Sequence, residues 1–247
     1  MRDFIQYLYD TGLGARLDFV NSYLCFAMEI CVGQWLAKKL KIKWWAALIL
    51  TFVRFFAAGT IATLIYQLHN NFNAVGGGFL TMAYVYVPLV LAPIYLLMRV
   101  HWKTACDYLA ITLAVFQWPI HIGCIFKSCC NGYESSFGIW NAYKGHYTFP
   151  IQIVNCVTGL CIALFLIYLL SKNGFKPTGR LYPILLILHG VERLGLDFAR
   201  DTRKDLLGLT YAQLHATFMI LVGAVSLCIL IVISRKIKEK PNKRRLR

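Results

Sequence analysis

The chain of 247 residues is 58% hydrophobic and only 15% charged, and its mean hydropathy is +0.57. Soluble globular domains carry about 25% charged residues, so this composition excludes an ordinary soluble enzyme and favours an integral membrane protein. The formal net charge of +15 would suggest nucleic-acid binding in a soluble protein. Here the basic residues fall between apolar runs, so we predict no nucleic-acid partner.

Seven apolar runs follow one another along the chain, each about long enough to cross a bilayer as a helix. A short amphipathic segment over residues 1–17 precedes them. The runs cover residues 19–37, 44–68, 78–99, 105–126, 149–171, 180–198 and 212–234. We therefore predict an all-α membrane protein with seven transmembrane helices, built as a single integral-membrane domain over residues 1–247.

The loops between these runs alternate between rich and poor in Lys and Arg. The rich set consists of the segments around residues 38–43, 99–103 and 172–180 and the tail 235–247, and it holds 17 of the 26 basic residues. Positively charged loops stay on the cytoplasmic side of a membrane. We therefore predict an N-terminus outside and a C-terminus in the cytoplasm.

The sixth apolar run carries a narrow polar stripe. At about 100° per residue, four polar or charged side chains fall within an arc of about 80°: His189, Arg193, Asp197 and Arg200. Ionisable groups inside a membrane segment usually mark a functional site, and two guanidinium groups against one carboxylate favour an anionic ligand such as phosphate. The alternative is an internal salt bridge of Arg193 with Asp197, with Arg200 at the lipid headgroups.

The same run carries a family resemblance. Arg193-Leu-Gly-Leu-Asp197-Phe-Ala-Arg200, followed by Leu207-Gly-Leu-Thr210 and Gln213, resembles the C-terminal signature of bacterial prolipoprotein diacylglyceryl transferases. That family usually has Glu where this chain has Asp197. Phe149-Pro-Ile-Gln152 is similar to the family's His-Pro-Ser-Gln at the start of its fifth span. Seven spans with an external N-terminus agree with this resemblance.

The resemblance implies a phospholipid-dependent transferase in the bacterial cytoplasmic membrane, with a site open toward the outer leaflet. The diacylglyceryl group would pass from phosphatidylglycerol to an acceptor thiol, either the lipobox cysteine of a prolipoprotein or another acceptor. Arg193 and Arg200 would hold the phosphate, and Asp197 would orient Arg193. Stabilising the departing phosphate would be the main electrostatic task.

A second segment, residues 120–132, resembles the family's hallmark loop Gly-Arg-x-Gly-Asn-Phe-x-Asn-Gly-Glu-x-x-Gly. Gly132 keeps its register with that loop, whereas His121 replaces the Arg, Cys124 the Asn and Cys129 the Glu. His121 would bind phosphate when it is protonated. Cys129 would act as a base only as a thiolate, which needs positive charge nearby. This cysteine-containing form is similar to divergent members of the family.

The loop cysteines leave several interpretations open. Cys124 could form a disulfide with Cys129 or Cys130 on the outer side, one thiol could be catalytic, or the residues could simply pack closely. Three thiolates with His121 could also bind a metal, but the spacing is not a recognised zinc pattern, so we expect neither metal nor cofactor. The alternative function is a non-enzymatic lipid-binding or thiol-redox membrane protein on the same fold.

The remaining candidates are expected to bind substrate. They are His189, Cys124, Gly132, Gln152, Gln213 and Tyr23. A glycine run at Gly76–Gly78 resembles a Gly-Gly-rich family segment but lacks its histidine. Glu29 and Arg54 are further intramembrane charges, and each could pair with the stripe or with the other.

Overall fold

The computed structural model describes residues 1–69, 71, 83–201 and 208–244, with side chains described as far as residue 236. Within these ranges it contains eight helices and one two-stranded sheet. The elements are α1 (Arg2–Asp10), α2 (Leu13–Leu40), α3 (Trp44–His69), α5 (Val87–Leu97), α6 (Trp102–Phe126), β1 (Glu134–Asn141), β2 (His146–Thr148), α7 (Ile151–Lys172), α8 (Leu181–Asp197) and α9 (Tyr211–Arg244).

The helices from α2 onward coincide with the seven predicted apolar runs. Within the described ranges, four helices are long and apolar enough to cross a membrane: α3, α6, α7 and the part of α9 from Tyr211 to Lys236. Helix α5 has 11 residues and α8 has 17, while residues 78–82 of the third run lie outside the described part of the chain. The helical membrane class is therefore confirmed, and the count of seven spans remains a prediction.

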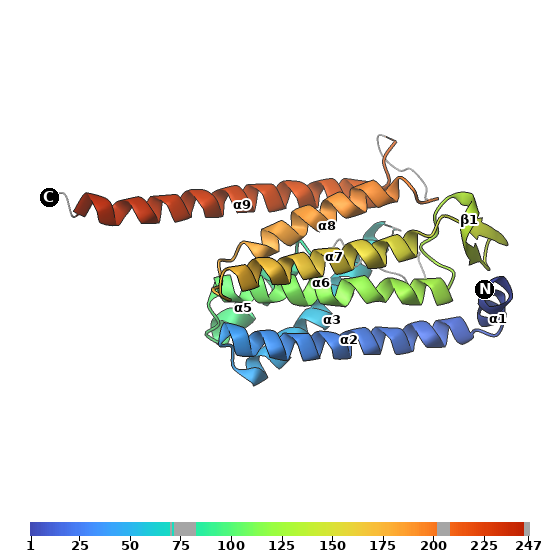
Figure 1. Ribbon diagram of the computed structural model, residues 1–247, viewed down its shortest axis with the longest axis horizontal. Helices are drawn as coiled ribbons and strands as arrows, with labels where there is room; N and C mark the ends of the chain where they lie inside the picture. The colour runs from blue at the N-terminus through green and yellow to red at the C-terminus, as the bar shows by residue number, and fades with distance from the viewer. Residues whose placement is uncertain (70, 72–82, 202–207, 245–247) are drawn as a thin grey trace.

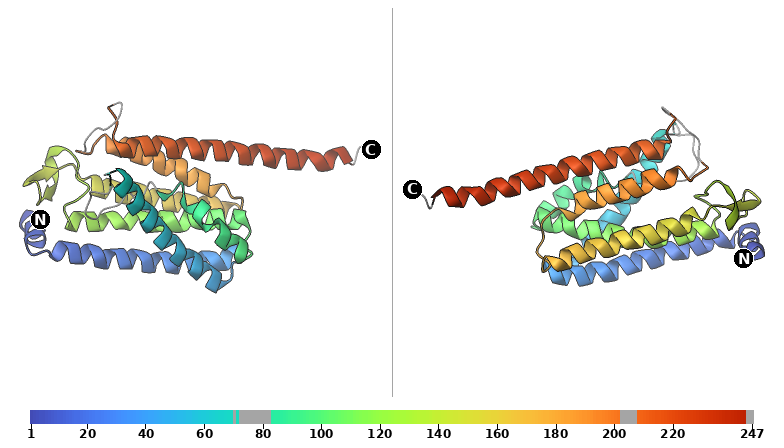
Figure 2. Two further views of the ribbon diagram at one scale, coloured as in Figure 1. Left: turned by 180° about the vertical axis from the view of Figure 1, so that it is seen from behind. Right: turned by 45° about the horizontal axis from the view of Figure 1, so that its top comes forward.

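Helix α6 is the centre of the bundle. Two thirds of its most apolar window is buried (67%), against 28% for α3 and α7. Figure 1 shows α2 and α7 running beside it along most of its length, and α3 crosses the bundle obliquely in Figure 2. Tyr108, Leu109, Ile111 and Leu113 of α6 are fully buried in the core. The side chains of α6 are therefore surrounded by protein, and a polar group on this helix must find its partners inside the bundle.

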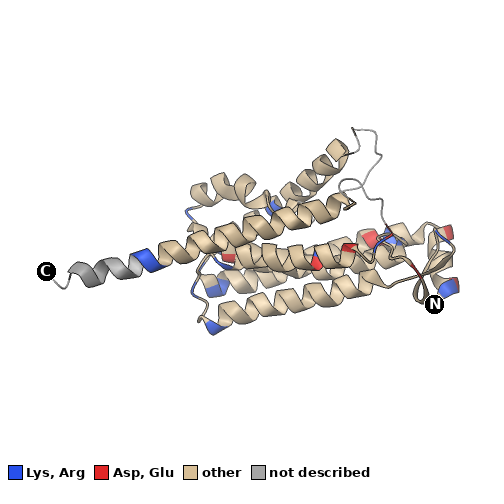
Figure 3. Cartoon of the chain, turned by 90° about the horizontal axis from the view of Figure 1, so that it is seen from above, with Lys and Arg blue, Asp and Glu red and all other residues tan. Residues whose placement is uncertain are grey.

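The connections between helices gather at two opposite ends of the bundle. The α2–α3, α5–α6 and α7–α8 connections lie at one end, and α1, β1 and the start of α9 lie at the other (Figures 1 and 2). Lys and Arg are drawn mainly near the two ends of the bundle, with few along the helices (Figure 3). The predicted basic loops thus share one end, as their alternation requires.

A short hairpin follows α6, which a purely helical prediction misses. β1 pairs antiparallel with β2, and Trp140 of β1 donates a hydrogen bond to Gln6 of α1 over 3.0 Å. The Arg2 guanidinium lies 4.3 Å from the centre of the Trp140 ring. These contacts join segments more than 130 residues apart, so they left no local pattern in the sequence.

A side chain of α6 holds the N-terminus of α8 in place. The Asp107 carboxylate accepts backbone N–H groups of Thr178, Gly179 and Leu181 over 2.6, 3.0 and 3.0 Å. The first N–H groups of a helix have no partner within it, so this carboxylate supplies acceptors that the helix lacks.

The C-terminal half of α8 lies unusually close to α9. A Cβ on Gly190 would lie 2.9 Å from the carbonyl oxygen of Ala216 and 2.7 Å from Ile220 Cγ1. Only glycine permits this approach, which brings the end of α8 against the beginning of α9.

Candidate functional site

The predicted stripe ends in a compact charged cluster. Helix α8 ends at Asp197, and the following turn places Arg200 beside it. Arg193 Nη2 and Arg200 Nε each lie 3.5 Å from the same oxygen, Asp197 Oδ1. The side chains are 12% (Arg193), 6% (Arg200) and 1% (Asp197) exposed, so one nearly inaccessible carboxylate lies between two largely buried guanidinium groups.

The other oxygen of this carboxylate is bound from α9. Thr210 donates its hydroxyl hydrogen to Asp197 Oδ2. Thr210 and Gln213 form a reciprocal capping box, since Thr210 N donates to Gln213 Oε1 over 2.9 Å and Gln213 N donates to Thr210 Oγ1 over 3.1 Å. The predicted site residue Gln213 therefore caps α9 and supports Asp197 through Thr210.

The charged cluster keeps unused hydrogen-bond donors. Among the described residues, no hydrogen-bond partner is found for Arg193 Nε or for Arg200 Nε and Nη2, although Arg200 Nε takes part in the ion pair with Asp197. Two guanidinium groups and one carboxylate carry a formal net charge of +1. Buried donors without partners are costly, and an anion with several oxygens would satisfy them.

The hallmark loop contacts this cluster. Gly132 forms a β-bridge with Arg200, and Tyr133 N donates to the Ala199 carbonyl over 3.0 Å. A Cβ on Gly132 would lie 2.6 Å from the backbone oxygen of Phe149, so a side chain does not fit there. Gln152 donates to the Cys129 carbonyl over 2.8 Å and thereby holds the loop in place.

Within the loop, Cys130 rather than Cys129 lies with the polar groups. Cys130 Sγ is 3.7 Å from Cys124 Sγ, and Cys124 Sγ is 3.9 Å from His121 Nδ1. All nine cysteines are free thiols, so the disulfide considered from the sequence is not formed. Lys127 forms an ion pair with Asp18 over 3.1 Å, so its positive charge is compensated by that carboxylate rather than by a thiolate.

The two adjacent cysteines differ in acidity. Hydrogen bonds from Cys124 and Cys129, followed by His121 and the charge of Arg200, hold the pKa of Cys130 well below its usual range. For Cys129, the contact with Cys124 lowers the pKa, but the contact with Cys130 and burial outweigh it and raise the value to about 12. The same contacts therefore act in opposite directions on the two neighbouring thiols.

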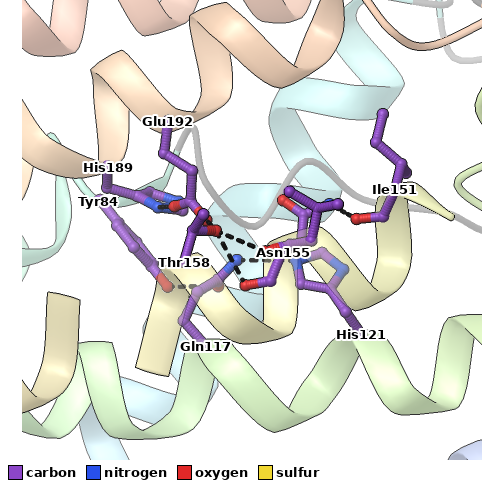
Figure 4. A network of polar contacts seen from close by, with 9 residues as sticks. Tyr84, Gln117, His121, Ile151, Asn155, Thr158, His189 and Glu192 are labelled. Atoms are coloured by element: carbon purple, nitrogen blue, oxygen red, sulfur yellow. Dashed lines mark hydrogen bonds and ion pairs between the residues drawn. The ribbon is translucent and has the colours of Figure 1, made fainter. Parts of the chain in front are cut away.

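A chain of polar side chains leads from His121 deeper into the bundle (Figure 4). Gln117 Nε2 lies 3.2 Å from His121 Nε2, and the Tyr84 hydroxyl donates to Gln117 Oε1 over 2.6 Å. The His189 ring stacks near the Tyr84 ring with centroids 5.2 Å apart. These contacts connect α6 with α8 through the segment before α5.

His189 belongs to this second network and does not contact Asp197. Its Nδ1 lies 2.6 Å from Glu192 Oε2, and Thr158 of α7 donates to the other Glu192 oxygen. His189 thus orients Glu192 inside the bundle, one turn from the charged cluster.

Of three further groups of residues singled out in the sequence, the structure describes two. Tyr23 is 59% exposed on α2 and packs edge-on against Phe19, so the structure does not bring it to the cluster. Glu29 and Arg54 form a buried ion pair with each other, remote in sequence from the stripe. The glycine run at Gly76–Gly78 lies outside the described residues.

The sequence analysis left out several residues that belong to the site. Thr210 could have been found, because Thr-x-x-Gln before an apolar run is a capping-box pattern. Cys130 could not be separated from Cys129, since the choice depends on left-handed backbone angles at Ser128 (φ 52°) and Cys130 (φ 55°) that reverse the chain.

The fold and the site define a helical membrane protein with a buried arginine–carboxylate cluster beside a cysteine-containing loop. The sequence model of the prolipoprotein diacylglyceryl transferases matches residues 20–229, and the chain belongs to this family.

Two relatives are similar over part of the chain. The phosphatidylglycerol–prolipoprotein diacylglyceryl transferase 2 of Clostridium perfringens (strain 13 / Type A) is 29% identical over 128 residues, which is 49% of each protein. The phosphatidylglycerol–prolipoprotein diacylglyceryl transferase of Clostridium tetani (strain Massachusetts / E88) is 26% identical over 125 residues, or 47% of this chain and 49% of the relative. The matched region thus spans about half the length of both relatives.

Proposed function

We propose that this protein is a phospholipid-dependent diacylglyceryl transferase. It transfers the diacylglyceryl group of phosphatidylglycerol, or of a similar anionic phospholipid, to an acceptor thiol. That thiol is the lipobox cysteine of a prolipoprotein or the thiol of another acceptor. Membership of the family and the names of its two relatives support the proposal.

The charged cluster of α8 is the observation that carries this function. Arg193 and Arg200 share one carboxylate oxygen of Asp197 at 3.5 Å, yet retain donors without partners among the described residues. Arginine forks match the oxygens of a phosphate, and the cluster keeps one positive charge after Asp197 is counted. A phosphodiester carries one negative charge and therefore balances it.

The chemistry follows from this placement. The acceptor thiolate attacks the glycerol carbon of the donor, a C–S bond forms, and the C–O bond to the phosphate breaks. Negative charge gathers on the departing glycerol phosphate, which Arg193 and Arg200 stabilise in a site of low dielectric. Asp197 acts as a positioning residue, because its Oδ1 attracts both guanidinium groups and keeps them close together.

A groove on the same helix pair suits the acyl chains of the donor. An apolar cavity of about 550 Å³ lies between α5, α8 and α9 and includes Leu186, Val222 and Ile229. Leu186 precedes Arg193 by nearly two helical turns, so the two share a face about 10 Å apart along the axis. A headgroup at Arg193 would thus leave its acyl chains beside this groove.

The membrane placement is part of the proposal. All seven helices from α2 to α9 cross the bacterial cytoplasmic membrane, with the N-terminus outside and the C-terminus in the cytoplasm. The charged cluster lies at the end of α8 opposite the basic loops, and the site opens toward the outer leaflet. The basic loops on the far end support this orientation.

A transfer assay tests the function. The purified protein is incubated with vesicles containing phosphatidylglycerol with labelled acyl chains and a lipobox peptide, and the lipidated peptide is quantified. Arg193→Ala and Arg200→Ala should each reduce transfer by about 10²–10³-fold, the loss expected for one donor to a developing oxyanion. Arg180→Ala, at the other end of the same helix, is the matched control and should retain full transfer. Equal rates for Arg193→Ala and Arg180→Ala would refute the assignment.

The non-enzymatic alternative keeps one supporting observation, the 3.7 Å separation of the Cys124 and Cys130 sulfurs. A lipid-binding or thiol-redox protein would bind phosphatidylglycerol vesicles without lipidating any thiol peptide. In that case Cys124→Ala would alter the redox response of the protein and Arg193→Ala would alter only binding.

A further inference from the structure

One imidazole and two thiols come together where α6 ends. His121 and Cys124 lie one turn apart on α6, and the loop returns so that Cys130 faces them. Their ligand atoms all lie within 4.8 Å of one another, with sulfur atoms 3.7 Å apart and Cys124 Sγ 3.9 Å from His121 Nδ1. The return of the chain is secured by backbone contacts, since Cys129 N donates to the Cys124 carbonyl over 3.1 Å.

These separations match a shared tetrahedral metal ion. Two thiolates bound to Zn²⁺ at about 2.3 Å lie roughly 3.8 Å apart, and an imidazole nitrogen at about 2.0–2.1 Å lies roughly 3.5 Å from each sulfur. The sulfur–sulfur distance of 3.7 Å already has this value, and Nδ1 would have to move only about 0.4 Å closer to the Cys124 sulfur. A disulfide would instead require the sulfurs to approach to about 2.05 Å.

The imidazole has the outer partner that a metal ligand requires. When Nδ1 binds a metal, Nε2 must carry the proton and donate it, usually to a carboxylate or carbonyl oxygen. Gln117 lies 3.2 Å from His121 Nε2, and a turn of its amide by 180° presents Oε1 to that proton and Nε2 to the Tyr84 hydroxyl. The network of Figure 4 therefore provides His121 Nε2 with a hydrogen-bond partner whether or not that nitrogen carries the proton.

We propose that His121, Cys124 and Cys130 form a binding site for a zinc-like cation, with one coordination position left open. Two thiolates and an imidazole select Zn²⁺ and related soft or borderline ions over Mg²⁺ and Ca²⁺, which prefer oxygen. The cysteine spacing alone predicted no metal in this loop, and the proposal departs from that prediction. Three protein ligands with an open fourth position are the arrangement of catalytic rather than structural zinc.

The open position gives the site a role that rests on the proposed function. The β-bridge of Gly132 with Arg200 holds the loop that carries Cys130 beside the phosphate-binding cluster. The acceptor thiol binds the metal as a thiolate. It then attacks the glycerol carbon to form the C–S bond while the C–O bond to phosphate breaks. The thiol proton is released to solvent when the thiolate binds the metal, and the glycerol phosphate departs as a dianion, so no oxidant or reductant is needed.

Metal content tests the site without reference to activity. The full-length protein, purified in detergent with a non-chelating reductant and exposed to equimolar Zn²⁺, should retain about one zinc per chain. Cys124→Ser and Cys130→Ser should reduce bound zinc at least about tenfold. Cys156→Ser, a half-buried cysteine of α7, is the matched control and should keep the metal. Loading with Co²⁺ should produce a sulfur-to-cobalt absorption band that disappears in the two ligand variants.

A conservative ligand exchange guards against variants that fail to fold. His121→Cys supplies a third thiolate and should restore metal binding, whereas His121→Ala should not, with both checked for a monodisperse elution profile. Zinc retained in the Cys124→Ser/Cys130→Ser double variant, or no zinc in the reduced parent protein, would overturn the proposal. A Cys124–Cys130 disulfide in protein taken from its native membrane would overturn it as well.

Titration with a lipobox peptide separates this inference from the proposed function. A change in the cobalt spectrum on adding the peptide, absent with its Cys-to-Ser analogue, shows that an acceptor thiol takes the open position. Zinc binding without diacylglyceryl transfer would leave the metal site standing and refute the transferase. Transfer by protein that binds no zinc would support the transferase and refute the metal site.

Discussion

Replacing Asp197 by alanine should destabilise the protein more than any other single change in the charged cluster. The carboxylate is 1% exposed and interacts with Arg193 and Arg200 at 3.5 Å each and with the Thr210 hydroxyl. At an effective dielectric constant near 20, each ion pair attracts with about 5 kcal/mol before desolvation is counted. Removing one partner of a buried pair costs about 3–5 kcal/mol, because it leaves uncompensated buried charge.

The loss is measurable as a melting temperature. A protein of this size loses about 2–4 °C per kcal/mol, so Asp197→Ala should lower Tm by roughly 6–20 °C. The intrinsic fluorescence of the six Trp residues reports unfolding in detergent. Asp197→Glu keeps the charge on a longer side chain that still reaches both guanidinium groups, and it should lower Tm by less than about 4 °C. If the two variants melt within about 2 °C of each other, the carboxylate charge is not what holds the cluster together.

Four smaller changes test the packing, helix capping and charge pairing of the fold. Gly132→Ala places a Cβ 2.6 and 3.2 Å from two backbone oxygens, so it should cost about 1–3 kcal/mol and reduce transfer. Gly59→Ala meets no atom within 4 Å and should raise Tm slightly, as helical Ala is favoured over Gly by about 1 kcal/mol. Asp107→Asn removes the charge that accepts three N–H groups at the start of α8, and it should cost about 1–3 kcal/mol with faster amide exchange in that turn alone. The hydrogen bond and charge of Lys144 lower the pKa of Asp201, so this pair stabilises above the ordinary Asp value of 3.8 and is lost as pH falls through the lowered value. Because Asp201 is largely exposed, Asp201→Asn should change stability by less than about 1 kcal/mol at pH 7, and the difference from the parent should vanish in acid.

The parts of the fold that depend on local pattern could be predicted from the sequence. Apolar runs located the helices from α2 to α9 in the described part of the chain, because a membrane demands continuous apolar surface. Helical periodicity also placed Arg193 beside Asp197, four residues apart on one face. Arg200 lies beyond the end of α8. The turn that follows the helix nevertheless keeps its Nε 3.5 Å from Asp197 Oδ1, the same separation as that of Arg193 Nη2.

The parts that depend on tertiary contact could not be predicted. His189 shares the stripe but turns to Glu192, because Thr158 on α7 and the Tyr84 ring surround that side of α8. Cys129 and Cys130 are neighbours in sequence, and only the reversal of the chain after α6 brings the Cys130 sulfur to 3.7 Å from that of Cys124. No periodicity in a single sequence encodes either choice.

The orientation of the bundle decides which compartment the site serves. The hairpin and the charged end of α8 lie at one end, and the basic α7–α8 connection lies at the other. Tyr143, at the hairpin turn, is 72% exposed, and Ser171, at the end of α7, is exposed at the opposite end.

A membrane-impermeant maleimide added to intact cells should therefore label Tyr143→Cys and spare Ser171→Cys, and permeabilised cells should label both. The parent protein, with its nine native cysteines, provides the background in each case. Selective labelling of Ser171→Cys in intact cells would show that the bundle is inserted in the opposite orientation. The arginine cluster would then face the inner leaflet, and its acceptor would have to be a cytoplasmic thiol rather than an exported lipoprotein precursor.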